Sequence, residues 1–131
     1  MQFLQPPDWP RAKGYSNGIA AKGTMVFVAG EIGWDPVTEK VVSDDFVVQF
    51  RQALENTLAI LKEAGAGPEH ICRMTWFITD KAAYLDKARE VGQAYRDVIG
   101  RHYPVMAVIE VKGLMEPGAM VEIETTAVVP D

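Results

Sequence analysis

Strict alternation of apolar and polar side chains marks the end of the chain. Residues 118–129 read GAMVEIETTAVV, and successive side chains of a strand point to opposite faces of its sheet. One row is apolar or small and is expected to face the core: Val121, Ile123, Thr125, Ala127 and Val129. The other row carries Glu122 and Glu124 in its middle, which predicts a face turned toward solvent, a partner or a pocket.

Apolar residues recur at helical spacing in residues 43–67. Ser43 or Asp44 can cap the start of this helix, and Gly65 or Gly67 can end it. Its predicted apolar stripe is Phe46, Phe50, Ala53, Leu54, Thr57, Leu58 and Leu61. One stripe of this width predicts a helix that covers a sheet on one side only.

A second helix is predicted from about Ala82 to Ile99, with Asp80 as its cap. Its predicted stripe is Leu85, Ala88, Val91, Tyr95 and Val98. Residues 71–79, ICRMTWFIT, precede it and are rich in β-branched and aromatic side chains, as strands are. Pro104 follows it and introduces a further predicted strand, VMAVIEV.

The first third of the chain predicts an arm and a hairpin. Residues 1–12 contain three prolines and are expected to form an irregular arm. A short strand is predicted at about Met25–Ala29, and DPVTEK supplies the turn after which KVV returns. The predicted order is therefore strands, helix, strand, helix, strand, strand.

Two helices with one apolar stripe each can cover only one face of such a sheet. In VMAVIEV the row expected to face the helices is Val105, Ala107, Ile109 and Val111. That assignment places Met106, Val108 and Glu110 on the uncovered face, together with Glu122 and Glu124. A face that mixes Met, Val and acids is typical of a subunit interface, so we expect a homo-oligomer with polar sites between subunits.

Composition narrows the class of protein. The chain has 131 residues, 48% of them hydrophobic and 24% charged, which fits a single domain spanning 1–131. Its net charge of −5 and lack of Lys/Arg clusters disfavour a nucleic-acid partner. No basic stretch leads into an apolar one at the N-terminus, and no run approaches a membrane span. We expect a cytoplasmic protein with a small-molecule partner and no membrane partner.

Five segments in order resemble the Rid/YjgF family of reactive-intermediate (enamine/imine) deaminases. They are GYSNGI, VFVAGEIGWDP, QFRQALENTLAILKEAGAG, ICRMTWFITD and VEIETTAVV, and the resemblance runs from Lys13 to Val129. It implies an α+β, chorismate mutase-like fold: a mixed sheet with two helices packed on one face, assembled as a homotrimer. It also implies a ligand site in the cleft between subunits, where an enamine or imine is hydrolysed to a keto acid and ammonia.

The family's site residues transfer to particular positions of this chain. The resemblance implies that Tyr15 lines the pocket and that Glu122 helps to activate water. The family's arginine, which holds the substrate carboxylate, falls on Met106 in YPVMAV. Methionine cannot bind a carboxylate and commonly packs at interfaces, so the usual small 2-imino acid loses its anchor.

Two cations are candidates to replace that arginine. Arg89 falls on the second helix near the expected cleft, and the alternative for it is a solvated helix face. Arg73 lies on its strand on the face opposite Met74 and would be costly to bury without a partner. Neither reading excludes the other.

Further candidates line the same expected pocket. Glu31 stands where relatives carry Gln, and Gly30 can bring its backbone N–H close to a ligand. Trp34 can stack on a planar conjugated substrate or can simply pack in its hairpin. Glu122 is either a general base, favoured by partial desolvation, or a solvated or ion-paired interface acid. Glu110 can serve as an interface ion-pair partner.

Other chemistry has little support. Cys72 is the only cysteine, so no intramolecular disulfide can form, and a buried structural role is favoured over a nucleophile. His70 and His102 flank helix ends and show no metal-ligand spacing, so neither a metal nor a cofactor is expected.

The sequence thus predicts a divergent enamine/imine deaminase that acts on a larger conjugated substrate, such as 2-aminomuconate. The alternative is a non-catalytic metabolite-binding or sensing protein on the same trimeric scaffold, which the loss of the arginine at position 106 favours. A ribonuclease is less favoured because the chain is acidic.

Overall fold

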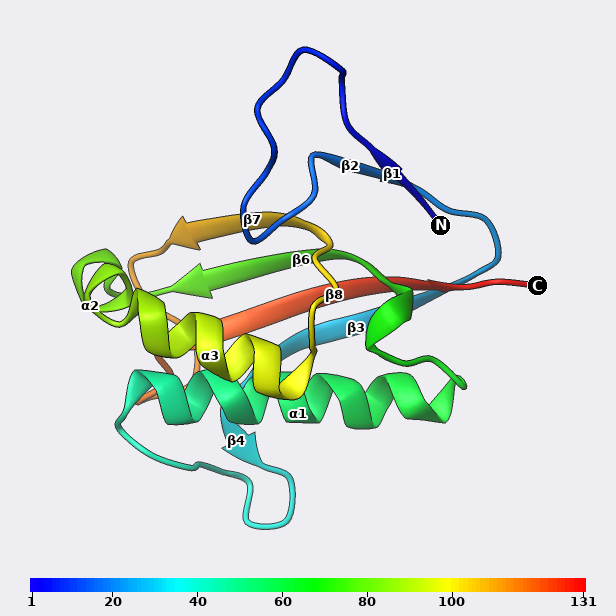
Figure 1. Ribbon diagram of the computed structural model, residues 1–131. Coiled ribbons are helices and arrows are strands. Elements are labelled where there is room, and N and C mark those ends of the chain that lie inside the picture. The colour runs from blue at the N-terminus through cyan, green and yellow to red at the C-terminus, as the bar shows by residue number, and fades with distance from the viewer.

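A four-stranded sheet in the order β3-β8-β6-β7 forms the centre of the computed structural model, which describes residues 1–131 (Figure 1). β8 runs antiparallel to both of its neighbours, and β7 runs parallel to β6. The elements are β1 (Gln2–Leu4), β2 (Gly18–Ala20), β3 (Thr24–Ile32), β4 (Trp34–Asp35), β5 (Lys40–Val41), α1 (Phe46–Glu63), η1 (Pro68–His70), β6 (Ile71–Ile78), α2 (Lys81–Asp86), α3 (Ala88–Val98), β7 (Val105–Glu110) and β8 (Val121–Val129). This is the expected α+β class.

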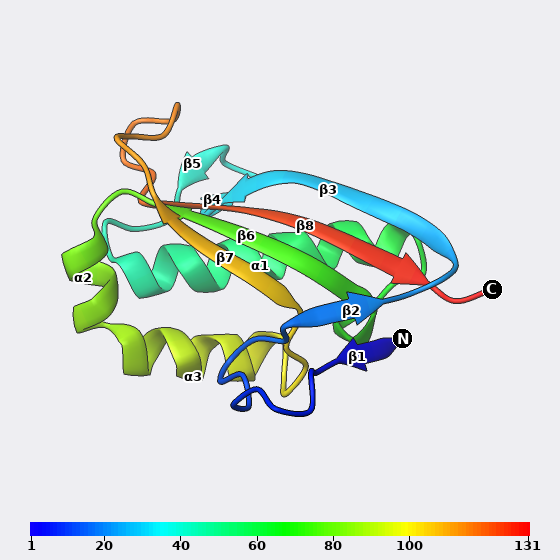
Figure 2. The same cartoon turned by 90° about the horizontal axis from the view of Figure 1, so that it is seen from above.

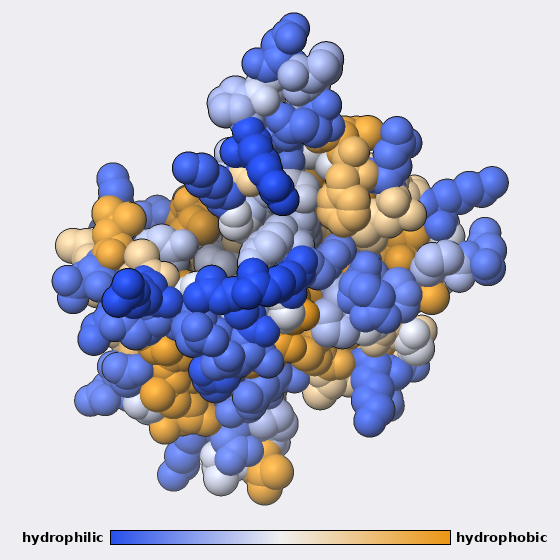
Figure 3. All heavy atoms as spheres, viewed as in Figure 1, coloured by the Kyte–Doolittle hydropathy of each residue, from blue (hydrophilic) through white to orange (hydrophobic).

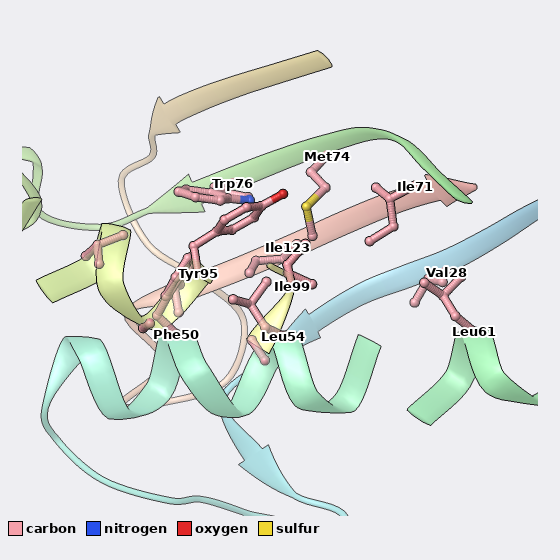
Figure 4. Close-up of a cluster of buried hydrophobic side chains, with 14 of the residues drawn as sticks. Val28, Phe50, Leu54, Leu61, Ile71, Met74, Trp76, Tyr95, Ile99 and Ile123 are labelled. Atoms are coloured by element: carbon pink, nitrogen blue, oxygen red, sulfur yellow. The ribbon is translucent and has the colours of Figure 1, made fainter. Parts of the chain in front are cut away.

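The alternation predicted for β8 is confirmed. Val121, Ile123, Thr125 and Ala127 are buried, whereas Glu122 is half-buried and Glu124 is exposed. The buried row faces α1, and the two glutamates lie on the opposite face of the sheet. Figure 4 shows Ile123 next to Leu54 of α1 in the layer between sheet and helices, which also contains Phe50.

Helix α1 packs its predicted stripe against β3 and β8. Phe46, Phe50, Ala53, Leu54, Thr57 and Leu61 are buried, as expected, and Leu58 is half-buried. The predicted cap is wrong by a residue or two, because Asp45 is the N-cap and its carboxylate accepts a hydrogen bond from the N–H of Val48 at 3.0 Å. Gly65 ends the helix in a left-handed conformation with φ of 68°.

The second predicted helix is two helices. Lys87, at φ −102° and ψ 15°, separates α2 from α3, so three helices rather than two lie beneath the sheet (Figure 1). The break turns Leu85 and Ala88 outward, and the buried side chains of α3 are Val91, Ala94 and Tyr95. Asp80 caps the first of these helices, as predicted, and accepts from the N–H of Ala83 at 3.0 Å.

The predicted facing of β7 is wrong. Met106 pairs with Met74 and Val108 pairs with Trp76, and both partners point into the core. Met106 and Val108 therefore lie on the helix side, and the row with Val105, Ala107 and Ile109 lies on the uncovered face. Both rows are apolar, so alternation alone does not distinguish them.

Glu110, at the end of β7, is not free on the uncovered face. Its carboxylate accepts a hydrogen bond from the backbone N–H of Lys81 at 2.6 Å, in the first turn of α2. The predicted interface ion pair is replaced by this local contact, because Glu110 pairs with Ile78 at the strand end just before α2 begins.

The N-terminal arm is partly ordered into a ribbon. β1 pairs with β2 antiparallel, from Gln2 opposite Ala20 to Leu4 opposite Gly18, so the arm is not wholly irregular. Figure 2 shows this ribbon beside the starts of β6 and β7, across the sheet from β3. The predicted turn at DPVTEK is confirmed, but the returning strand β5 pairs with the short β4 rather than with β3, whose partner is β8.

A fully buried amide joins three segments of the fold. The Nε2 of Gln49 donates to the carbonyls of Ser43 at 2.8 Å and Gly118 at 2.9 Å, and its Oε1 accepts from the N–H of Met120 at 2.8 Å. These bonds tie the first turn of α1 to the loop that leads into β8. Gly33 completes the junction, because a Cβ there would lie 2.4 Å from the Cα of Gln49.

We expect Gln49→Met to lower the free energy of unfolding by about 3 kcal/mol or more, because three backbone groups lose their partner at a buried position. The measurement is urea denaturation followed by circular dichroism. Gln52→Met on the same helix is the control, since Gln52 bonds only to the side chain of Asn56. An equal loss of unfolding free energy in the two variants would show that the buried amide of Gln49 contributes no more than an ordinary side-chain hydrogen bond.

Candidate functional site

The carboxylate of Glu122 borders a hollow of about 350 Å³ beyond the end of β3. We call it the acidic hollow, because Glu31, Glu39, Glu116 and Glu122 border it and no Lys or Arg does. Glu122 is half-buried and makes no hydrogen bond or ion pair within the chain. A carboxylate held in this way keeps its lone pairs available to accept a proton from water.

Backbone geometry places the side chain of Glu122. The register of β3 against β8 shifts between Val28 and Glu31, and Gly30 sits in this irregularity. A Cβ on Gly30 would lie 2.8 Å from both Cδ and Oε2 of Glu122. Glycine at this position lets the carboxylate lie directly against the backbone, and a side chain there would displace it.

Trp34 forms one wall of the acidic hollow and is held in position from two sides. Its indole Nε1 donates to Oε1 of Glu31 at 3.1 Å, and its backbone carbonyl accepts from Nδ2 of Asn56 at 2.8 Å. Asn56 lies on α1, so the hairpin is tied to the same helix that carries Gln49. Trp34 thus packs in its hairpin and also borders the acidic hollow, and its stacking on a substrate stays a prediction.

Tyr15 lies at the opposite edge of the sheet, where the arm passes β7. The neighbouring Ser16 fixes this passage, because its N–H donates to the carbonyl of Pro104 at 3.1 Å and its hydroxyl donates to the carbonyl of Tyr103 at 2.5 Å. Tyr15 and Met106 together border a small hollow of about 370 Å³, the edge hollow, which Arg73 also borders.

On the helix side of β7, Tyr15 and Met106 also border a hollow of about 380 Å³. We call it the aromatic hollow. Its lining consists of Lys13, Gly14, Tyr15, Trp76, Tyr84, Ala88, Val91, Gly92, Tyr95, Arg96, Tyr103, Met106 and Val108. Five aromatic rings and two cations contribute to it, and no carboxylate does.

The aromatic wall is rigid because its rings pack on one another. The ring of Tyr95 lies 5.8 Å from that of Tyr103 in a stacked arrangement and 5.9 Å from that of Trp76. The hydroxyl of Tyr95 donates to the carbonyl of His102 at 2.6 Å. Burial, reinforced by the neighbouring Tyr103, raises the pKa of Tyr95 well above its usual range. Figure 4 shows Trp76 and Tyr95 in the same layer as the core.

A third hollow at the β7 edge, of about 750 Å³, lies under the arm and is here called the arm hollow. It shares Lys13, Tyr15 and Tyr103 with the aromatic hollow and is also bordered by Arg11 and Arg101. Figure 3 looks onto this edge of the molecule and shows strongly hydrophilic residues between the arm and α3. Lys and Arg thus gather at the β7 edge of an acidic protein.

The residues predicted for the site fall into two groups within one chain. Gly30, Glu31, Trp34 and Glu122 share the acidic hollow, and Tyr15 and Met106 share the edge and aromatic hollows. The remaining candidate, Arg89, is exposed in the first turn of α3 and borders none of these hollows.

The two groups are well separated. β7 and β8 have β6 between them, and Met106 and Glu122 are in register with residues three apart on β6, Met74 and Phe77. Standard strand dimensions put their Cα atoms about 10 Å apart across the sheet and about 10 Å apart along it. They also lie on opposite faces, so one small molecule cannot touch both in a single chain.

Sequence reasoning missed the aromatic hollow and its cation Arg96. Tyr95 was predicted as part of a helix stripe, and Trp76 as part of a strand, with no link between them. The signal available was spacing: Gly92 and Arg96 are four residues apart, so they lie on one face of α3, next to the Val91 and Tyr95 stripe.

The surroundings of Cys72, His70 and His102 favour structural roles for these side chains. Burial raises the pKa of the half-buried Cys72 thiol, which disfavours the nucleophilic thiolate. His70 accepts from the N–H of Gly67 at 2.9 Å, and His102 lies 2.6 Å from the carbonyl of Ile71. No three His, Cys, Asp or Glu residues gather closely enough to hold a metal ion. None of the helices has the length and apolar character needed to cross a membrane.

Comparisons with known proteins match this fold and this sequence. Residues 8–129 match the model of the family described as endoribonuclease L-PSP. The chain is 28% identical to human 2-iminobutanoate/2-iminopropanoate deaminase over 86% of this chain and 79% of that protein. Among solved structures, Rv2704 from Mycobacterium tuberculosis, a member of the YjgF/YER057c/UK114 family, is 34% identical with a TM-score of 0.66, covering 88% of this chain and 87% of that one.

TdcF from Escherichia coli, solved with bound serine, is 32% identical with a TM-score of 0.70 and covers 98% of both chains. The family and fold expected from the sequence motifs are therefore confirmed.

The buried hydroxyl of Tyr95 predicts a loss of stability at high pH. Its pKa is raised on folding, so its contribution is fully present below the unfolded value of about 10 and is lost as pH rises through the folded value. We expect the free energy of unfolding to fall by up to about 1.4 kcal/mol per pH unit above about pH 10.

Urea denaturation at pH 8 to 11.5 measures this slope, and Tyr95→Phe is expected to make it shallower. Tyr15→Phe is the control, because Tyr15 is exposed. An unchanged slope in Tyr95→Phe would assign the pH dependence to other groups.

Proposed function

This chain belongs to the endoribonuclease L-PSP family, which includes the Rid/YjgF proteins, and from that starting point we propose that it is an enamine/imine deaminase with Glu122 as general base. The observation that carries the proposal is the unpaired, half-buried carboxylate of Glu122 against the backbone of Gly30. The human relative named for deamination of 2-iminobutanoate and 2-iminopropanoate supports the reaction class.

The reaction is a hydrolysis without any change of oxidation state. An enamine first takes a proton from solvent on carbon and becomes an iminium ion. Glu122 accepts a proton from water as the water oxygen bonds to the iminium carbon. Glu122 then returns this proton to the nitrogen of the tetrahedral intermediate and the carbon–nitrogen bond breaks. Ammonia leaves, and the hydroxyl releases its proton to solvent as the carbonyl of the product forms.

The site requires more than one copy of the chain. Glu122 on the outer face and the hollows at the β7 edge do not reach one small molecule within one subunit. A neighbouring copy that places its β7 edge against the acidic hollow completes the site. We place the active site in this cleft, in a homotrimer.

The surfaces available for such an assembly are complementary. The uncovered sheet face exposes apolar side chains, with Phe27 70% and Met25 57% accessible in the single chain. The acidic hollow carries four glutamates and no cation, whereas the edge, aromatic and arm hollows carry cations and no acid. Opposite charges facing each other fix the register of association.

Met106 sets the specificity of the proposed reaction. A guanidinium at this position would offer a two-pronged contact to a substrate carboxylate, and a thioether cannot. The smallest 2-imino acids therefore lose most of their binding energy. A larger conjugated substrate, such as 2-aminomuconate, gains apolar contact with Met106 and stacking with Trp34.

A non-catalytic binding protein is the second candidate, and Met106 is the observation that favours it. The solved structure of TdcF with bound serine shows that a relative of this fold holds a small molecule. A nucleic-acid substrate, which the family description names, is less favoured by the net charge of −5. Tight RNA binding that weakens steeply with salt would restore it.

The assembly is tested by light scattering. We expect a mass about three times the 14.5 kDa of the chain for the wild type. Phe27→Asp is expected to shift the population to smaller species, because it places a charge on the uncovered apolar face. Val37→Asp, in the exposed turn of the β4–β5 hairpin, is the matched control and is expected to remain assembled. A monomeric wild type would remove the shared site.

Ammonia release from enamines generated in solution tests the chemistry. The panel contains 2-aminoacrylate and 2-aminomuconate, and we expect wild-type turnover of the larger member. Glu122→Gln is expected to slow that turnover by about 10²-fold or more, as loss of a general base does. Glu124→Gln on the same face is the control, with activity near wild type.

Met106→Arg separates the two candidate functions. Appearance of 2-aminoacrylate turnover in this variant, with no turnover of any member by the wild type, would favour the binding protein. Wild-type turnover that survives in Glu122→Gln would remove Glu122 as the base.

A further inference from the structure

We propose that the aromatic hollow receives a carboxylate ligand with a flat aromatic or conjugated side chain, and that Arg96 and Lys13 bind its carboxylate in place of an arginine at position 106. The inference rests on the proposed function, because it names the substrate class of that site. It assigns the anchor to α3 and the arm rather than to β7.

The shape and lining of the hollow favour a flat apolar group. A volume of about 380 Å³ matches a ligand the size of one ring with a short acid side chain. Trp76, Tyr95 and Tyr103 form one continuous wall. The ring centroid of Tyr95 lies 5.9 Å from that of Trp76 and 5.8 Å from that of Tyr103. Val108 and Met106 close the side toward β7. Stacking on such a wall selects planar groups.

Arg96 forms no ion pair, and the nearest acidic group that senses its charge is the exposed carboxylate of Asp97. Arg96 is half-buried, and its only side-chain hydrogen bond goes to Oε1 of Gln93 at 3.3 Å. The adjacent Asp97 is already paired with Arg51 at 2.9 Å. Partial burial of an unpaired guanidinium is unfavourable until an anion joins it.

Gly92 shapes the position of Arg96. A Cβ on Gly92 would lie 3.3 Å from Nη1 of Arg96, so the guanidinium lies close over this glycine at the rim of the hollow. Lys13 reaches the same hollow from the arm, whose path is fixed by the hydrogen bonds of Ser16 to the Tyr103 and Pro104 carbonyls. Two cations from different elements therefore border the same hollow.

A buried donor on the wall of the hollow also lacks a partner. Trp76 is 6% exposed, and its indole Nε1 makes no hydrogen bond. Buried donors without acceptors are rare in folded proteins. A carbonyl or imine acceptor on an occupant would satisfy it after a small movement of the surrounding side chains.

Charge is segregated around this edge in a way that favours an anion. Five of the 13 Lys and Arg residues border the aromatic, edge and arm hollows, namely Arg11, Lys13, Arg73, Arg96 and Arg101, and none of the 18 Asp and Glu residues does. Arg73 lies on the other face of β6 from the aromatic hollow, and Arg89 is exposed outside it. Arg96 is thus the cation best placed against the ring wall.

Binding of three small probes tests the inference without relying on turnover. Cinnamate has the ring and the carboxylate, cinnamamide lacks the charge, and acrylate lacks the ring. Titration calorimetry with the assembled wild-type protein is expected to give affinity for cinnamate at least about tenfold above that for either of the other two.

Arg96→Gln is expected to weaken cinnamate about tenfold and to leave cinnamamide unchanged. Lys13→Gln is expected to have the same effect to a smaller degree, because Lys13 is more exposed. Lys62→Gln, at the far end of α1 and outside every one of these hollows, is the matched control and should match the wild type.

Two results would overturn the inference. One is equal binding of cinnamate by the wild type and Arg96→Gln; the other is a loss in Arg89→Gln that Arg96→Gln does not show. If either result were found while ammonia release still depended on Glu122, the deaminase proposal would stand and only the carboxylate anchor would be wrong. Selective cinnamate binding that depends on Arg96, without any ammonia release, would instead support the anchor and remove the catalysis.

Discussion

The buried amide of Gln49 is the interaction on which the arrangement of the acidic hollow depends. A neutral side chain can satisfy two carbonyls and one N–H at once only if all three are brought to it, and this requirement fixes α1 against the start of β8. Glu122 follows Met120 by two residues, so its position is inherited from that junction. Gly33 belongs to the same constraint, since any side chain there would collide with the backbone of Gln49.

A second constraint works at the other edge of the sheet. The arm crosses β7 at Ser16, whose two hydrogen bonds reach the residues just before that strand, and this crossing brings Lys13 and Tyr15 beside Met106. The chain therefore holds hollows of opposite charge, one bordered by the end of β3 and the others at the β7 edge. In the proposed reaction, neither set alone contains all of the groups that hydrolysis of an imino acid requires.

Most of the fold follows from local patterns, and its errors have physical causes. The faces of β8 could be predicted because only one of its rows carries acids, whereas β7 is apolar in both rows and its facing is decided by pairing with Met74 and Trp76. The break between α2 and α3 at Lys87 could not be predicted, because no proline or glycine lies near it in the sequence. Gln49 could have been found, because it falls between Phe46 and Ala53 on the apolar stripe, where a polar residue must be paired.

The candidate site was harder to predict than the fold, since its residues come from distant parts of the chain. Motif transfer assigns Tyr15, Gly30 and Glu122 to the site, and these assignments stay predictions. It could not identify a compensating cation, because compensation depends on position in space rather than on alignment. Arg89 is exposed and borders none of the hollows, whereas Arg96 lies two turns further along α3 and borders the aromatic hollow. Loss of an arginine on a strand can be offset by a cation on the helix beneath it, provided that a glycine such as Gly92 leaves room for it. A carboxylate held by α3 rather than by β7 would lie in a hollow lined by aromatic rings, which favours a flat conjugated group next to it.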